Sequence, residues 1–202
     1  MHKVFISYHH ENDQWAKDEL IKLNDKYKVF EDKSVDTGDI DDALPDETIR
    51  VKIRDEYLRD STVTILLVGE KTKYRKHIDW ELYSSMRDSM INKKSGILVL
   101  MLPNVDCGYF TIGHGEDEKA LLYPDVHRWI RLTERTEYEN RYSYMPERII
   151  DCLLKGESHI SVVQWEKIAN SPEILRQLIE WTYADRENCK YDLSRQMRRR
   201  NG

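Results

Sequence analysis

Two nearly continuous apolar runs, Val63–Val68 and Ile97–Leu102, dominate the hydrophobic pattern of the first half of the chain. Strands buried on both faces of a sheet look like this, because helices cover both sides of a parallel sheet. The shorter run Val4–Ile6 predicts a first strand, and Tyr27–Phe30 predicts a weaker second one. The pattern therefore predicts four strands of a largely parallel sheet before Pro103.

Polar segments with apolar residues at helical spacing separate these runs. The first predicted helix starts at Asn12 or Asp13, and the second covers residues 48–58. For the third helix Asp79 is the expected N-cap, which would place Glu81 in the first turn. The core residues expected on these helices are Trp15, Leu20 and Leu23 on the first, Ile49, Ile53 and Tyr57 on the second, and Ile78, Leu82, Met86 and Met90 on the third. This alternation predicts a doubly wound, flavodoxin-like α/β domain.

The C-terminal half has a weaker pattern. We expect a last strand at His127–Leu132 and a helix at Pro146–Leu154. Ser171-Pro172-Glu173 marks a further helix start, with proline at the first helical position, and a charged helical stretch should follow to about Met197. The expected organisation is an α/β domain over residues 1–155, with a helical extension over residues 156–202 packed on it.

Composition narrows the class of protein. A chain of 202 residues that is 40% hydrophobic can bury a substantial core. Its net charge of −5 offers no basic field for nucleic acid, and its longest apolar run is too short to span a bilayer. The three cysteines are widely spaced and form no CxxC pair, which suits a reducing compartment and argues against structural zinc. We therefore expect a soluble cytoplasmic protein without nucleic-acid or membrane partners.

The candidate site follows from the loops that leave the strands. In an open parallel sheet, ligands bind beyond the carboxyl ends of the strands, and here three loops (7–12, 31–46 and 70–79) leave such ends. The long acidic loop 31–46 is the expected cover of the site. The residues expected at this edge are Ser7, Tyr8, His9, Asp36, Trp80 and Glu81, with Tyr83 and Ser84 next to Glu81. A carboxylate among aromatic and hydroxyl-binding groups suits an aromatic ligand that contains ribose.

Several familiar motifs are missing from the sequence. It has no GxGxxG after the first strand, no GxxxxGK[ST], no GxSxG and no metal-ligand cluster on one helix face, so no metal is expected. A first-turn acid such as Glu81 can also act only as a partner of the helix dipole, without any chemical role.

Four short boxes stand in register within roughly residues 3 to 102: Val4–Tyr8 followed by Asp13; Asp36–Ile40; Ser61 with Leu66–Gly69; and Tyr74 with Glu81-Leu82. In this order and spacing they resemble a known family, the TIR (Toll/interleukin-1 receptor) domains. TIR enzymes usually carry a Trp-Cys pair where this chain has His77 and Ile78. The adjacent pair Trp80-Glu81 instead resembles the TIR-like proteins of bacterial antiphage systems of the Thoeris type.

The resemblance implies an enzyme that cleaves the nicotinamide–ribose bond of NAD+, with Glu81 as the catalytic carboxylate. NAD+ is then the substrate, and no further cofactor is expected. Proteins of the Thoeris type make a cyclic ADP-ribose isomer that activates a partner effector, and TIR enzymes commonly assemble into homo-oligomers. An alternative is a non-catalytic TIR module that acts by homotypic assembly, since one fold hosts many functions. A flavodoxin-like receiver or nucleotide binder ranks last, because the first strand ends without the paired acids of a phosphoacceptor site.

Overall fold

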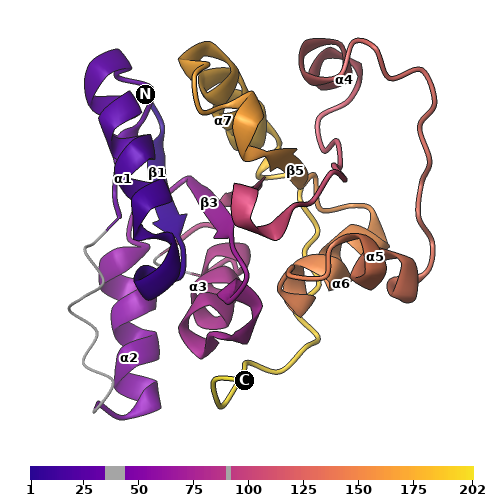
Figure 1. Ribbon diagram of the computed structural model, residues 1–202. Coiled ribbons are helices and arrows are strands. Elements are labelled where there is room, and N and C mark those ends of the chain that lie inside the picture. Colours follow the sequence, from indigo (N-terminus) through magenta and orange to yellow (C-terminus); the bar gives the residue numbers. More distant parts are fainter. Residues whose placement is uncertain (35–43, 90–91) are drawn as a thin grey trace.

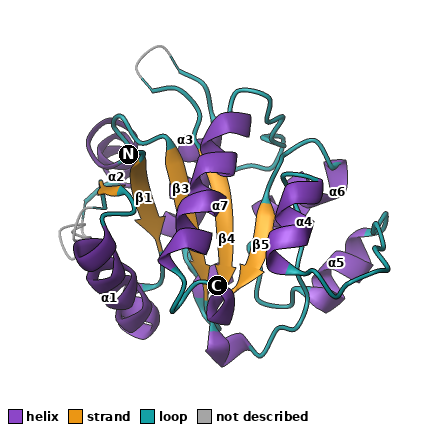
Figure 2. Ribbon diagram, turned by 90° about the horizontal axis from the view of Figure 1, so that it is seen from above, coloured by secondary structure: helices purple, strands orange, loops and turns teal. Residues whose placement is uncertain are grey.

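The computed structural model describes residues 1–34, 44–89 and 92–202. Its centre is a five-stranded parallel sheet in the order β2-β1-β3-β4-β5, which Figure 2 shows with helices on both sides. The strands are β1 (Lys3–Ser7), β2 (Glu31–Asp32), β3 (Val63–Val68), β4 (Gly96–Met101) and β5 (Ser161–Gln164). This confirms the expected doubly wound, flavodoxin-like α/β class.

Helices cover both faces of the sheet. The α-helices are α1 (His10–Tyr27), α2 (Asp46–Lys52), α3 (Lys76–Met86), α4 (Glu116–Leu122), α5 (Arg135–Arg141), α6 (Glu147–Lys155) and α7 (Pro172–Asp185). A π-helical turn, Ile53–Tyr57, continues α2, and 3-10 turns lie at Thr72–Tyr74, Pro103–Val105 and Trp165–Lys167. Helices α1 and α7 pack on one face, whereas α3 and α6 pack on the other (Figure 2).

The side-chain alternation of β1 decides which residues reach which face. Val4 and Ile6 join the core under α1 and α7. Phe5 packs on the opposite face against α2 and α3, so Ser7 also points to the face that α3 covers. Strands β3 and β4 are buried along their whole length, as their uninterrupted apolar runs predicted.

Several predicted elements differ from the structure. The second strand is β2 rather than Tyr27–Phe30, because α1 runs through Tyr27. The expected strand at His127–Leu132 is irregular, and Ile130 is 67% exposed. The charged stretch after α7 is irregular and not helical, and its residues Tyr191 and Leu193 pack against the core on the α3 and α6 face. Trp15 is 40% exposed, since α1 instead buries a stripe of Asp13, Ala16, Lys17, Leu20 and Asn24.

The fifth strand comes from beyond residue 155. Strand β5 pairs with β4 over Leu98–Met101, and α7 packs on the core under β3 and β4. The segment 156–185, expected to form an appended extension, thus supplies an edge strand and a covering helix of the same sheet.

The last residues of the chain return to the start of α3 (Figure 1). Asp79 accepts hydrogen bonds from Arg148 Nε at 2.8 Å, from Arg148 Nη2 at 3.1 Å and from the backbone N–H of Arg198 at 2.7 Å. The backbone N–H of Gly202 donates to Tyr74 O at 2.9 Å. The prediction of Asp79 as N-cap was therefore wrong: α3 begins at Lys76, and the Asp79 carboxylate holds Arg148 and the C-terminal segment instead.

Replacing Arg148 by alanine should destabilise the protein by about 3–5 kcal/mol, because it leaves the buried Asp79 carboxylate without its cation. Urea unfolding of the full chain measures this loss. The double replacement Asp79→Leu/Arg148→Met removes both charges and should cost clearly less than Arg148→Ala alone. An Arg148→Ala variant as stable as the wild type would contradict this role of the ion pair.

Candidate functional site

The candidate site centres on a hydrogen bond between α3 and β1. Ser7 Oγ donates to Glu81 Oε2 at 2.6 Å, and the two residues are only 1% and 4% exposed. Because α3 begins at Lys76, Glu81 lies in the second helical turn and not in the first. The helix dipole acts mainly on the first turn, so it does not explain a carboxylate at this position.

Burial changes the acidity of Glu81. Loss of solvent raises the pKa of the Glu81 carboxyl to about 7, and the hydrogen bond from Ser7 opposes this rise. Near neutral pH the carboxyl is therefore close to half ionised. A group with a pKa near the working pH can hold either charge state at little cost, as catalytic carboxyls do.

The rest of this face of α3 continues the polar contact with the sheet. Ser85, one helical turn after Glu81, is hydrogen-bonded through its Oγ to Thr64 Oγ1 on β3 at 2.9 Å. The pairs Ser7–Glu81 and Thr64–Ser85 form a polar strip inside an otherwise apolar layer. A polar strip in a core is expensive to keep, which favours a role in binding or chemistry for the Glu81 pair.

Tyr8 and Trp80 point away from Glu81. Tyr8 packs in the core on the α1 side, where its hydroxyl donates to Gln14 Oε1 at 2.7 Å. Trp80 is fully buried between Phe5 and the apolar residues of α2 and its π-helical turn, and its Nε1 donates to Arg198 O at 2.8 Å. The structure therefore does not bring these two predicted ligand contacts to the Glu81 carboxyl.

The remaining predicted site residues are placed as follows. His9 is buried, and burial followed by the charge of Arg75 lowers its pKa, so its ring is neutral near pH 7. Tyr83 and Ser84 are half-buried on α3, and the Arg148 guanidinium carbon lies 5.1 Å from the Tyr83 ring centroid. Asp36 lies outside the described residues.

A second buried carboxylate, Asp13, was not among the predicted site residues. Burial raises the pKa of its carboxyl to about 6, although hydrogen bonds with Asn104 and Thr72 oppose the rise. Its Oδ1 has no hydrogen-bond partner among the described residues. A Cβ on Gly69 would lie 2.4 Å from both carboxylate oxygens, so the glycine leaves the room that Asp13 occupies.

Asp13 also belongs to the carboxyl edge of the sheet, because it lies in the first turn of the helix that follows β1, and Gly69 directly follows β3. Asp13 is the first member of the buried stripe on α1, and the helical spacing of that stripe is the sequence feature that could have revealed Asp13. The exposed Trp15 obscured that stripe.

A parallel sheet in the order 2-1-3-4-5 defines the flavodoxin-like α/β class, to which TIR-like domains belong. The family model described as Thoeris protein ThsB, TIR-like domain, matches residues 5–106, just over half of the chain. The chain belongs to this family, and its membership suggests a role in antiphage defence. A search of curated proteins finds no match to the chain. Within the described part of the chain, no helix has both the length and the apolar character needed to cross a bilayer.

The raised pKa of Glu81 makes a prediction for stability. The glutamate pKa is about 4.5 in the unfolded chain and about 7 in the folded one, so the folded state binds more protons between these values. Stability therefore falls as the pH rises from about 4.5 to 7, and the loss is complete above that range. Glu81→Gln removes this penalty, so between pH 5 and pH 8 it should gain stability relative to the wild type by up to roughly 3 kcal/mol.

Urea unfolding of both proteins at several pH values measures this difference. A second variant tests the role of the hydrogen bond. Ser7→Ala removes the donor that favours the ionised carboxyl, so the stability of this variant should fall more steeply with pH than that of the wild type. If wild type and Glu81→Gln had parallel pH dependences, the Glu81 carboxyl would have an ordinary pKa and the site as described would be wrong.

Proposed function

We propose that this protein cleaves the nicotinamide–ribose bond of NAD+ and makes a cyclic ADP-ribose isomer that activates an effector protein in the cytoplasm during antiphage defence. The observation that carries the proposal is the buried Glu81 carboxyl, held by Ser7 at the carboxyl edge of the sheet, with a pKa near neutrality. Membership of the Thoeris TIR-like family supports it.

In the proposed reaction the bond between ribose C1′ and the nicotinamide nitrogen breaks first. The bonding electron pair leaves with nicotinamide, which becomes neutral, and positive charge develops on the ribose ring as in other glycosidic cleavages. The ionised Glu81 carboxylate stabilises this charge, and its enclosure strengthens the interaction because few water molecules screen it. No general acid is needed, since the departing nicotinamide is already cationic in NAD+.

Cyclisation requires that an adenine nitrogen or a ribose hydroxyl of the same molecule attacks C1′ before water does. A hydroxyl that attacks gives its proton to the Glu81 carboxylate, whose raised pKa allows it to accept one. The low exposure of Glu81 and Ser7 favours this outcome, because a closed site excludes water. The same enclosure means that NAD+ enters only when the segments around Glu81 move apart. Assembly of several copies of the chain is a suitable trigger for that movement.

Glu81→Gln should lower the rate of NAD+ cleavage by at least roughly 100-fold, because the amide cannot supply the negative charge that the reaction needs. The test is incubation with NAD+ over a series of protein concentrations, with nicotinamide and nucleotide products resolved by chromatography and mass. The matched control is Glu19→Gln, which replaces an exposed glutamate on α1 and should leave the rate unchanged. Equal product formation by wild type and Glu81→Gln would refute the enzymatic proposal and favour a module that acts only by assembly.

A further inference from the structure

A cavity of about 490 Å³ lies at the β5 edge of the sheet, apart from Glu81. Segments 110–113 and 129–132, helices α5 and α6, and the residues before β5 build it, so all of it lies beyond the stretch that matches the TIR-like family. In the sheet, β3 and β4 separate β5 from β1, which amounts to three strand spacings, or roughly 14 Å. This cavity is therefore a separate feature from the Glu81 site.

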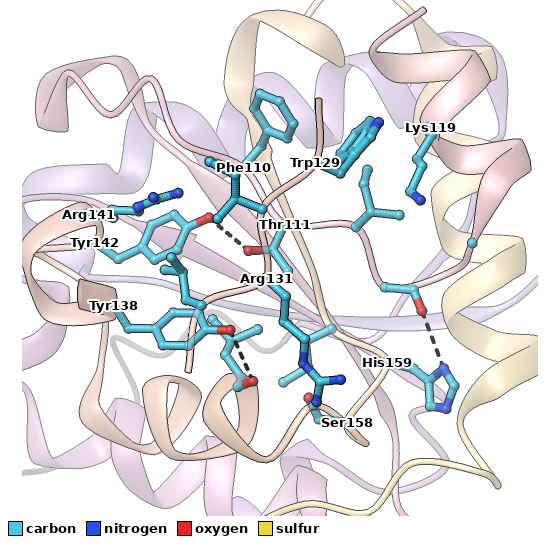
Figure 3. Close-up of a pocket in the computed structure, with 18 residues that line it drawn as sticks. Phe110, Thr111, Lys119, Trp129, Arg131, Tyr138, Arg141, Tyr142, Ser158 and His159 are labelled. Atoms are coloured by element: carbon cyan, nitrogen blue, oxygen red, sulfur yellow. Dashed lines mark hydrogen bonds between the residues drawn. The ribbon is translucent and has the colours of Figure 1, made fainter. Parts of the chain in front are cut away.

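The lining of this cavity is basic, although the chain as a whole carries a net charge of −5. Its described lining residues include Lys119, Arg131, Arg141 and His159, and no carboxylate. Figure 3 shows the Arg131 side chain extending through the middle of the lining toward Ser158, with Arg141 on one side and Lys119 on the other. An anion in this cavity would be surrounded by positive charge on several sides.

The two arginines supply the charge that is not already neutralised. Arg131 forms no hydrogen bond or ion pair with the described residues. Its guanidinium passes close to Gly156, where an added Cβ would lie only 2.6 Å from Nη2, so the glycine leaves room for it. Arg141 lies over the Tyr109 ring, 5.1 Å from its centroid, and forms no ion pair within the described part of the chain. By contrast, Lys119 pairs with Glu116 at 2.6 Å, and His159 lies 3.8 Å from Asp185.

Aromatic surface accompanies this charge. Trp129 is 37% exposed beside Phe110, and its Nε1 is held by Val126 O at 3.1 Å. Tyr138 and Tyr142 complete the wall, and their hydroxyls are already bonded to Leu153 O and to Thr111 Oγ1 (Figure 3). The rings are thus fixed in place, and because Tyr138 and Tyr142 are only 7% and 2% exposed, Trp129 offers most of the aromatic surface that a ligand can reach.

We propose that this cavity binds a nucleotide, with its phosphates on Arg131 and Arg141 and its base against the aromatic wall around Trp129. Guanidinium groups bind phosphate oxygens in pairs of hydrogen bonds, and free ones are well suited to it. Indole rings stack on bases of any sequence. The cavity volume falls within the usual range of small-molecule sites, roughly 300–1,000 Å³.

Isothermal titration calorimetry of the full chain with ADP tests this assignment. The wild type should bind ADP, and Arg131→Gln/Arg141→Gln should weaken binding by roughly ten-fold or more. The matched control, Arg59→Gln/Arg87→Gln, removes the same charge from two exposed arginines outside the cavity and should leave the affinity unchanged. Thermal unfolding of each variant verifies that the fold is kept.

Pyrophosphate and adenosine identify the parts of the ligand that are recognised, and each should bind more weakly than ADP. The proposal is overturned if ADP does not bind at millimolar concentration, or if the Arg131/Arg141 variant binds it as tightly as the wild type. ADP that binds no better than pyrophosphate contradicts recognition of the base. Loss of ADP binding in Glu81→Gln but not in the arginine variant would assign the ligand to the Glu81 site and overturn the proposal. Because calorimetry measures binding and not turnover, this test is independent of whether the protein cleaves NAD+.

Discussion

The candidate site depends on one constraint: the carboxyl group of Glu81 is kept away from water and has a single neutral hydrogen bond, from Ser7. Burying a carboxylate is costly, and one hydroxyl donor compensates for only part of that cost, which is why the pKa of the group rises to about 7. Such an arrangement lowers stability at neutral pH. A residue that costs stability and is nevertheless enclosed is the best candidate for chemistry in this domain.

Three consecutive residues of α3 determine how this carboxyl is aimed. Successive residues of a helix point about 100° apart, so each of the three faces a different part of the molecule. Asp79 holds Arg148 of α6 and the C-terminal segment, Trp80 fills the core beside Phe5, and Glu81 faces Ser7. Rotation of α3 would break all three sets of contacts at once, and the helix is thereby locked in the one orientation that presents Glu81 to β1.

The C-terminal segment takes part in this lock. Its backbone supplies the carbonyl that binds the Trp80 indole and the N–H group that binds Asp79, both from Arg198. These contacts join residues more than a hundred positions apart, and they connect the C-terminal segment, which lies beyond the family match, to the candidate site within it.

Much of the fold could be predicted from sequence, because β3 and β4 are buried on both faces and their residues record this directly. Ser7 and Glu81 were predicted at one edge from topology alone, but the direct bond between them depends on side-chain alternation in β1 and on the true start of α3. The sequence could not show that start, since Asp79 looks like a capping residue but is bound by an arginine 69 positions away. Strand β5 was missed because only four residues form it, whereas the apolar residues around the exposed Ile130 have a strand-like sequence pattern.

The most direct measurement of the central claim is an infrared titration of the Glu81 carboxyl in the wild-type protein, identified by difference from Glu81→Gln. The protonated carboxyl band of Glu81 should persist well above pH 5 and disappear with a midpoint near pH 7. A midpoint near 4.5, the ordinary value for glutamate, would show that the carboxyl is solvated and would contradict the account.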